Sequence, residues 1–170
     1  MPGIIDAPRG FIPISSPTGE IGRVRGYDLA AANTALGKHD MVTLTAAGTV
    51  DRSAASDTQI VGITARHAAA SAATVNFPIM DDYTAILLCQ FSDGTPVNAD
   101  RFLNYNIVVA AAVNNMSQME ADGTTGATTN TLPVKFLKVH TQPGNTIGAN
   151  AAVEVSFNNS VLKSIGVVGV

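Results

Sequence analysis

The sequence predicts an all-β protein: a small β-barrel or sandwich domain with an extended N-terminal arm and at most one or two short helices. Short stretches in which apolar and polar residues alternate recur along residues 38–157, and turn-forming residues separate them. The chain is 46% hydrophobic but only 14% charged, with few aromatic residues, so we expect a core built mainly of small side chains. Its 170 residues suit one domain, residues 38–170, preceded by an arm, residues 1–37.

Prolines and glycines interleave throughout the predicted arm, and this disfavours both helix interiors and central strands. The same segment is too apolar for a solvated tail, because it contains Ile4, Ile5, Phe11, Ile12 and Ile14. We therefore expect it to lie extended along a surface, which is either that of its own domain or that of a neighbouring protein. Residues 29–36 can form a short helical turn before the domain begins.

The first half of the domain contains five predicted strands. Residues 41–45, 49–52 and 59–65 come first, and residues 66–73 follow as a loop or brief helix. Residues 74–80 alternate, with Val75, Phe77 and Ile79 on one face, and Pro78 marks this strand as an edge strand or a bulge. Residues 85–91 are almost all apolar and predict a strand that is buried on both faces.

The second half is less regular. Residues 99–113 fit either a helix capped by Asp100 or two strands, and their Phe, Tyr, Ile and Val content favours strands at 101–103 and 107–111. Residues 116–121 alternate weakly, and a polar loop covers residues 122–131. Residues 134–140 and 152–157 are predicted strands, and the end of the chain, 161–170, is either a last strand or a docking tail.

Charge and composition exclude several classes of partner. The net charge of −3 and the scattered lysines and arginines offer no footprint for nucleic acid. No run approaches the ~18 apolar residues of a membrane span, and the N-terminus lacks the pattern of a signal peptide. The single cysteine, Cys89, excludes an intramolecular disulfide and fits a reducing compartment.

Residue patterns for catalysis are sparse. His39, His67 and His140 are far apart in sequence, and none has a second ligand at metal-binding spacing. Cys89 lies among apolar residues, which predicts a buried, inert thiol. Asp81 and Asp82 are expected to be solvated charges in a turn. Because phosphate-loop, dinucleotide-binding and nucleophile-elbow motifs are also missing, we expect no enzyme activity, no catalytic or metal-binding residues, and no cofactor.

Several stretches carry a resemblance to a known family. They are KHDMVTLTAAGTVDRS (38–53), IVGITA (60–65), VNFPIM (75–80) and AILLCQF (85–91), and later NNMSQMEADGTTG (114–126), LPVKFLKV (132–139) and NAAVEVSFNN (150–159). Their succession resembles the head decoration (cement) proteins of tailed bacteriophages. The resemblance covers roughly residues 38–160 and lies in the style of the strands and turns.

The resemblance implies a non-catalytic structural protein that is made in the host cytoplasm and stabilises the outer capsid surface of the virion. It also implies the major capsid protein as partner and a homo-oligomer, with a trimer favoured. An N-terminal arm commonly contacts the shell in this family, so the implied capsid-binding residues are Ile4, Ile5, Arg9, Phe11, Ile12, Ile14, Arg23 and Arg25. Two alternatives stay open, a phage tail-tube or connector subunit and a ligand-binding β module.

Overall fold

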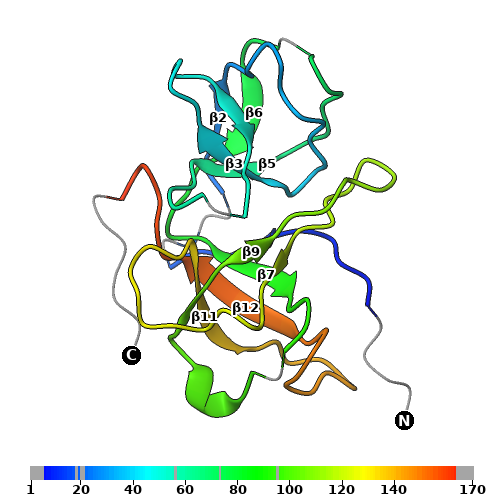
Figure 1. The fold of residues 1–170 in the computed structure, drawn as a ribbon, viewed down its shortest axis with the longest axis vertical. Coiled ribbons are helices and arrows are strands. Elements are labelled where there is room, and N and C mark those ends of the chain that lie inside the picture. Colours follow the sequence, from blue (N-terminus) through cyan, green and yellow to red (C-terminus); the bar gives the residue numbers. More distant parts are fainter. Residues whose placement is uncertain are drawn as a thin grey trace.

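The structure is a computed structural model that describes residues 6–17, 19, 22–55, 57–72, 74–94 and 96–163. Two five-stranded antiparallel sheets lie one above the other, and a two-stranded ribbon flanks the lower sheet (Figure 1). Within the described residues the helical structure is one 3₁₀ turn, Asn98–Asp100. The predicted all-β class with at most one or two short helices is therefore confirmed.

The upper sheet has the strand order β2-β6-β5-β3-β4. Its strands are β2 (Val24–Tyr27), β3 (Met41–Leu44), β4 (Val50–Arg52), β5 (Gly62–Thr64) and β6 (Phe77–Met80). The lower sheet has the order β1-β7-β12-β11-β8, built from β1 (Ile12–Ser15), β7 (Ile86–Gln90), β8 (Asn104–Tyr105), β11 (Val134–Val139) and β12 (Ala152–Phe157). The ribbon pairs β9 (Ile107–Val108) with β10 (Glu120–Ala121).

The two sheets share buried side chains, so the lobes are packed against each other. Successive residues of a strand point to opposite faces of its sheet. In β3, Met41 therefore enters the larger core cluster with the lower-sheet residues, whereas Val42 enters the smaller cluster of the upper lobe. Ile63, the cross-strand partner of Met41, also belongs to the larger cluster. The base of the upper sheet is thus buried on both faces.

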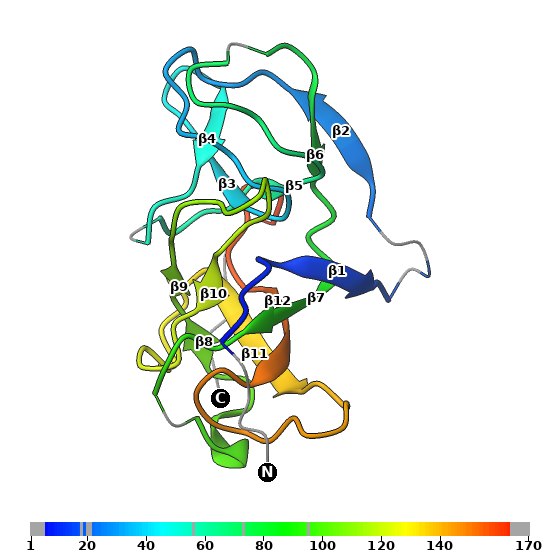
Figure 2. The same ribbon diagram turned by 90° about the vertical axis from the view of Figure 1, so that its right-hand side faces the viewer.

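The first 37 residues contribute one strand to each sheet. In the lower sheet β1 pairs with β7, and in the upper sheet β2 pairs with β6 (Figure 2). Phe11 is fully buried in the larger cluster, and Leu29 and Leu36 belong to the smaller one. The described part of the segment therefore packs on its own chain, and the expected boundary at residue 37 does not follow the sheets.

Local expectations fail where tertiary contacts override residue preference. Residues 29–36 form no helix, because Leu29 and Leu36 make isolated bridges to Val50 and Ala68. No strand forms at 101–103, where Phe102 adopts a positive φ of 68° and is 47% exposed. Val75, expected to face inward with Phe77 and Ile79, is 72% exposed because it precedes β6.

The predictions for β6 and β7 need correction. β6 lies between β2 and β5 and is not an edge strand. The N–H and C=O groups of one residue in an antiparallel strand point to the same side. The Pro78 carbonyl accepts the N–H of Ala65, just past the end of β5, so Pro78 faces away from β2 and its missing N–H removes no bond to β2. β7 is not buried on both faces, since Leu87 and Cys89 are buried while Ile86 and Leu88 are partly exposed.

Candidate interaction site

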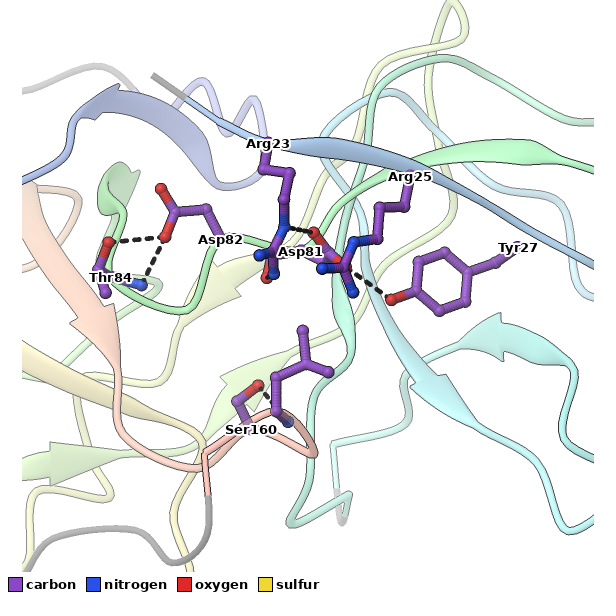
Figure 3. A network of polar contacts seen from close by, with 8 residues as sticks. Arg23, Arg25, Tyr27, Asp81, Asp82, Thr84 and Ser160 are labelled. Atoms are coloured by element: carbon purple, nitrogen blue, oxygen red, sulfur yellow. Dashed lines mark hydrogen bonds and ion pairs between the residues drawn. The ribbon is translucent and has the colours of Figure 1, made fainter. Parts of the chain in front are cut away.

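The most elaborate side-chain network in the described residues joins β2 to the segment that connects the two sheets. Arg23 directly precedes β2, and Arg25 and Tyr27 lie within it; because the three are spaced two residues apart, their side chains lie on the same face. All three converge on Asp81, which follows the end of β6 (Figure 3). Arg23 Nε donates to Asp81 Oδ1 at 2.9 Å, the Tyr27 hydroxyl donates to Oδ2 at 2.7 Å, and Arg25 Nη1 lies 3.4 Å from Oδ2.

Burial of the Asp81 carboxylate explains why so many donors surround it. Asp81 is 0% exposed, whereas the side chains of Arg23 and Arg25 are 49% and 51% exposed. A carboxylate in such a position is costly unless charged or polar donors satisfy both of its oxygens. The expectation that Asp81 is a solvated turn residue is therefore wrong. Its burial fixes two half-exposed guanidinium groups in defined positions.

The same contacts set the protonation of the donors. The hydrogen bond to Asp81 raises the pKa of Arg23 above its ordinary value. Burial, followed by the hydrogen bond to Asp81, raises the pKa of Tyr27. Both groups therefore stay in their donor forms at neutral pH.

Asp82 ties the same connecting segment to the lower sheet. Its Oδ1 accepts from the Thr84 hydroxyl at 2.6 Å and from the Thr84 backbone N–H at 2.9 Å. The Thr84 hydroxyl also lies 3.0 Å from that of Ser16, next to β1. Burial raises the pKa of Asp82, but hydrogen bonds from Thr84 and Ser16 outweigh this and lower it below its usual range. The connection between β6 and β7 is thus held from both lobes.

The structure separates the residues that the sequence grouped as capsid-binding. Arg25 lies on β2 and Arg23 directly precedes it, while Arg9 is exposed beside the lower sheet. Ile12 and Ile14 are half-buried on β1. Phe11 does not belong in the capsid-binding group, because its side chain is fully buried in the core and is not available to a partner. Ile4 and Ile5 lie outside the described residues.

A pocket of about 440 Å³ opens where the N-terminal segment and the loop at residues 142–150 meet the lower sheet. Ile12, Leu88 and Ala152 give it an apolar floor. The Gln90 side chain in its wall bonds within the protein, accepting the Ala7 N–H at 3.1 Å and donating to the Asn150 carbonyl at 2.8 Å. Among the described lining residues Arg9 is the one that carries a charge.

Glu120 is a buried acid that the sequence analysis did not single out. It lies in the ribbon strand β10, is 9% exposed, and its Oε1 has no hydrogen-bond partner among the described residues. Burial, together with the nearby charges of Asp6 and Asp93, raises the pKa of Glu120 to about 7. The sequence did contain a signal for this buried acid, since Glu120 lies between the apolar residues Met119 and Ala121.

The remaining titratable candidates are dispersed. Cys89 is buried as predicted, and burial raises the pKa of its thiol. Burial also lowers the pKa of His39, and His140 Nδ1 lies 3.1 Å from Glu154 Oε1, which Lys138 approaches at 3.2 Å. Within the described ranges no group of three His, Cys, Asp or Glu side chains is placed to hold a metal ion.

Comparison with protein-family profiles, with curated proteins and with solved structures found no match to this chain. In the part of the chain that the structure describes, no helix has the length and apolar character needed to cross a membrane. What the fold defines is an all-β protein of two packed antiparallel sheets. At the rim of the upper sheet, Arg25 of β2 and the preceding Arg23 form a half-exposed pair around buried Asp81.

Proposed function

We propose that this chain is a structural virion protein that binds and stabilises the outer surface of a phage capsid, without catalysis. The observation that carries the proposal is β2, whose first three residues are exposed and where Arg25 and the preceding Arg23 are held by a buried aspartate. The resemblance of the strand sequences to head decoration proteins supports the choice of a capsid. The partner is then the major capsid protein, and a homotrimer is the favoured assembly.

The physical argument concerns preorganisation. Association costs free energy when flexible side chains become ordered, at roughly 0.5–1.5 kcal/mol for each long side chain. Asp81 has already restricted Arg23 and Arg25, so a partner meets guanidinium groups whose positions are set before binding. Arginine is enriched at protein interfaces. On a repetitive shell, modest contacts of this kind combine through multivalency.

The proposal is tested by sedimenting the purified protein with undecorated shells. Deletion of residues 1–37 is unsuitable because it removes buried Phe11 and Leu36 together with β1 and β2. The informative variants are Arg25→Gln, which keeps the two shorter contacts of Asp81, and deletion of residues 1–5. Arg101→Ala, which removes an exposed positive charge at the far end of the lower lobe, is the matched control.

We expect the wild type and Arg101→Ala to co-sediment with the shells, and Arg25→Gln to bind at least several-fold more weakly. Deletion of residues 1–5 tests whether Ile4 and Ile5 also contribute. If the wild type stays in the supernatant at every concentration, the capsid proposal fails. Rings or tubes formed by the protein alone in electron micrographs would instead favour the tail-tube or connector alternative.

The pocket beside Arg9 favours a second candidate function, that of a ligand-binding β module. A volume of about 440 Å³ lies within the range of small-molecule sites, roughly 300–1,000 Å³. An apolar floor with one cation at its rim fits a small apolar anion. Titration with 8-anilinonaphthalene-1-sulfonate tests this: enhanced fluorescence that Arg9→Ala abolishes would support the module, and no enhancement would count against it.

A further inference from the structure

The outer edge of β2 has no backbone partner among the described residues. The Asp81 N–H donates to the Arg23 carbonyl at 3.1 Å, so the backbone groups of Arg23 point toward β6. Inward and outward pointing groups alternate along an antiparallel strand. Arg25 and Tyr27 therefore also bond inward, whereas the N–H and C=O groups of Val24 and Gly26 point outward. Pro78 supports this assignment. It is the cross-strand partner of Gly26, but its carbonyl bonds to Ala65 on the β5 side and not to Gly26.

The other edges of the two large sheets are covered or blunted by the chain itself. At β4, Val50 exchanges hydrogen bonds with Asp28 and Ala30. At β8, Asn104 and Ala127 exchange two backbone hydrogen bonds. Edge strand β1 contains Pro13 and a register shift, both of which oppose further pairing. Among the described residues β2 is the regular strand left open, and Figure 2 shows it on the rim of the upper sheet.

We propose that β2 accepts an extended segment of a partner protein as an additional strand, and that this segment alternates acidic and apolar residues. Backbone groups of Val24 and Gly26 would supply the hydrogen bonds of such strand addition. A residue of the partner opposite Arg25 shares its face, so a carboxylate there meets a guanidinium that is half-exposed and keeps free N–H donors. Residues on the other face meet Val24, which is 49% exposed.

A second copy of β2 is a poor occupant of this edge. The antiparallel register that uses both Val24 and Gly26 pairs Val24 of one copy with Gly26 of the other. That register places the two Arg25 side chains directly opposite each other, about 4.5–5.5 Å apart at Cβ, where like charges repel. Charges on an exposed edge strand discourage self-association in this way. An acidic segment of a different protein avoids the repulsion.

This inference deepens the proposed function and rests on it for the identity of the natural partner, but it can be tested with a synthetic probe. The probe is the blocked peptide Thr-Val-Glu-Val-Glu-Val-Thr carrying a fluorophore, and its counterpart has Gln in place of both Glu residues. Binding to the full chain is measured by fluorescence anisotropy. The protein variants are Val24→Pro, which removes an outward N–H without touching the bonds to β6, and Val24→Thr, which retains it.

We expect the acidic peptide to bind wild type and Val24→Thr with similar affinity. Binding to Val24→Pro should be at least tenfold weaker, and the Gln peptide should bind wild type roughly 2- to 5-fold more weakly for each charge removed. Hydrogen exchange followed by NMR supplies a readout that does not depend on a variant. In the free protein the amides of Val24 and Gly26 should exchange faster than those of Arg25 and Tyr27, and the peptide should slow them.

Three outcomes would overturn the inference: no binding of the acidic peptide to wild type, equal binding by folded Val24→Pro and Val24→Thr, or unchanged exchange at Val24 and Gly26 on binding. Shell sedimentation with the same two variants separates this inference from the proposed function. If both variants bind shells equally while the peptide fails, strand addition is wrong and capsid binding stands. If the peptide binds but the protein does not bind shells, strand addition stands and capsid binding is wrong.

Discussion

Replacing Glu120 by Gln should change how the stability of this protein depends on pH. Gln has nearly the same shape as protonated Glu but cannot ionise, so it isolates the cost of the buried charge. Glu120 is 9% exposed, and burial with the charges of Asp6 and Asp93 raises its pKa from 4.5 to about 7. Between these values the folded state holds a proton that the unfolded state has released. The free energy of unfolding therefore falls as pH rises from about 4.5 to 7.

The size of the effect follows from the pKa values. Each pKa unit corresponds to 1.36 kcal/mol, so the raised pKa destabilises the folded protein above pH 7 by at most about 3 kcal/mol. We expect Glu120→Gln to match the wild type near pH 4.5 and to exceed its stability by about 1–3 kcal/mol at pH 8. Burial also lowers the pKa of His39, but His39 is present in both proteins, so its contribution cancels in the difference.

The assay is urea denaturation at a series of pH values from 4.5 to 8, with the difference in unfolding free energy between the two proteins plotted against pH. Asp6→Asn provides an internal check. After burial, the charge of Asp6 is the next largest cause of the raised Glu120 pKa, and this variant removes it. The unfolding free energy of Asp6→Asn should therefore depend less steeply on pH than that of the wild type. A difference between Glu120→Gln and wild type that is constant across the series would refute the reasoning.

Three further outcomes are expected. Asp81→Asn should lower stability by about 1–3 kcal/mol, seen as a fall in Tm of roughly 2–12 °C, because its donors lose a charged acceptor; an unchanged Tm would contradict the central role of this carboxylate. Phe11→Ala should cost about 3–5 kcal/mol in urea denaturation, whereas a neutral effect would mean that Phe11 lies outside the core. Cys89 should react with a thiol reagent far more slowly in the native protein than in urea, and equal rates would show that the thiol is accessible.

Some of the fold was accessible from local pattern alone. Local patterns located β3, β4, β7, β11 and β12 to within a few residues. In β3 and β12 the signal was alternation, because a strand with one buried face repeats every two residues, and in β7 it was a continuous apolar run. The apolar surroundings of Cys89 likewise predicted its burial. Both inferences use only information that lies close together in the sequence.

The first 37 residues show where local pattern fails. Their prolines and glycines correctly argue against central strands, yet β1 and β2 form at sheet edges, where a strand needs partners on one side only. The apolar character of Phe11 was recognised, but local pattern does not reveal which surface such a residue covers. The surface that Phe11 covers was set by the larger core cluster, in which its side chain is buried.

The candidate site was decided almost entirely by tertiary structure. The sequence alone determined an all-β chain with alternating strands, and it showed two arginines spaced two residues apart in a segment expected to be extended. Asp81, which joins them, lies more than 50 residues further along the chain, and its place in the sequence resembles an ordinary turn. Only the pairing of β2 with β6 brings these groups together. The physical reason is that pairing between distant strands depends on register and burial in the whole fold, and no local pattern specifies either.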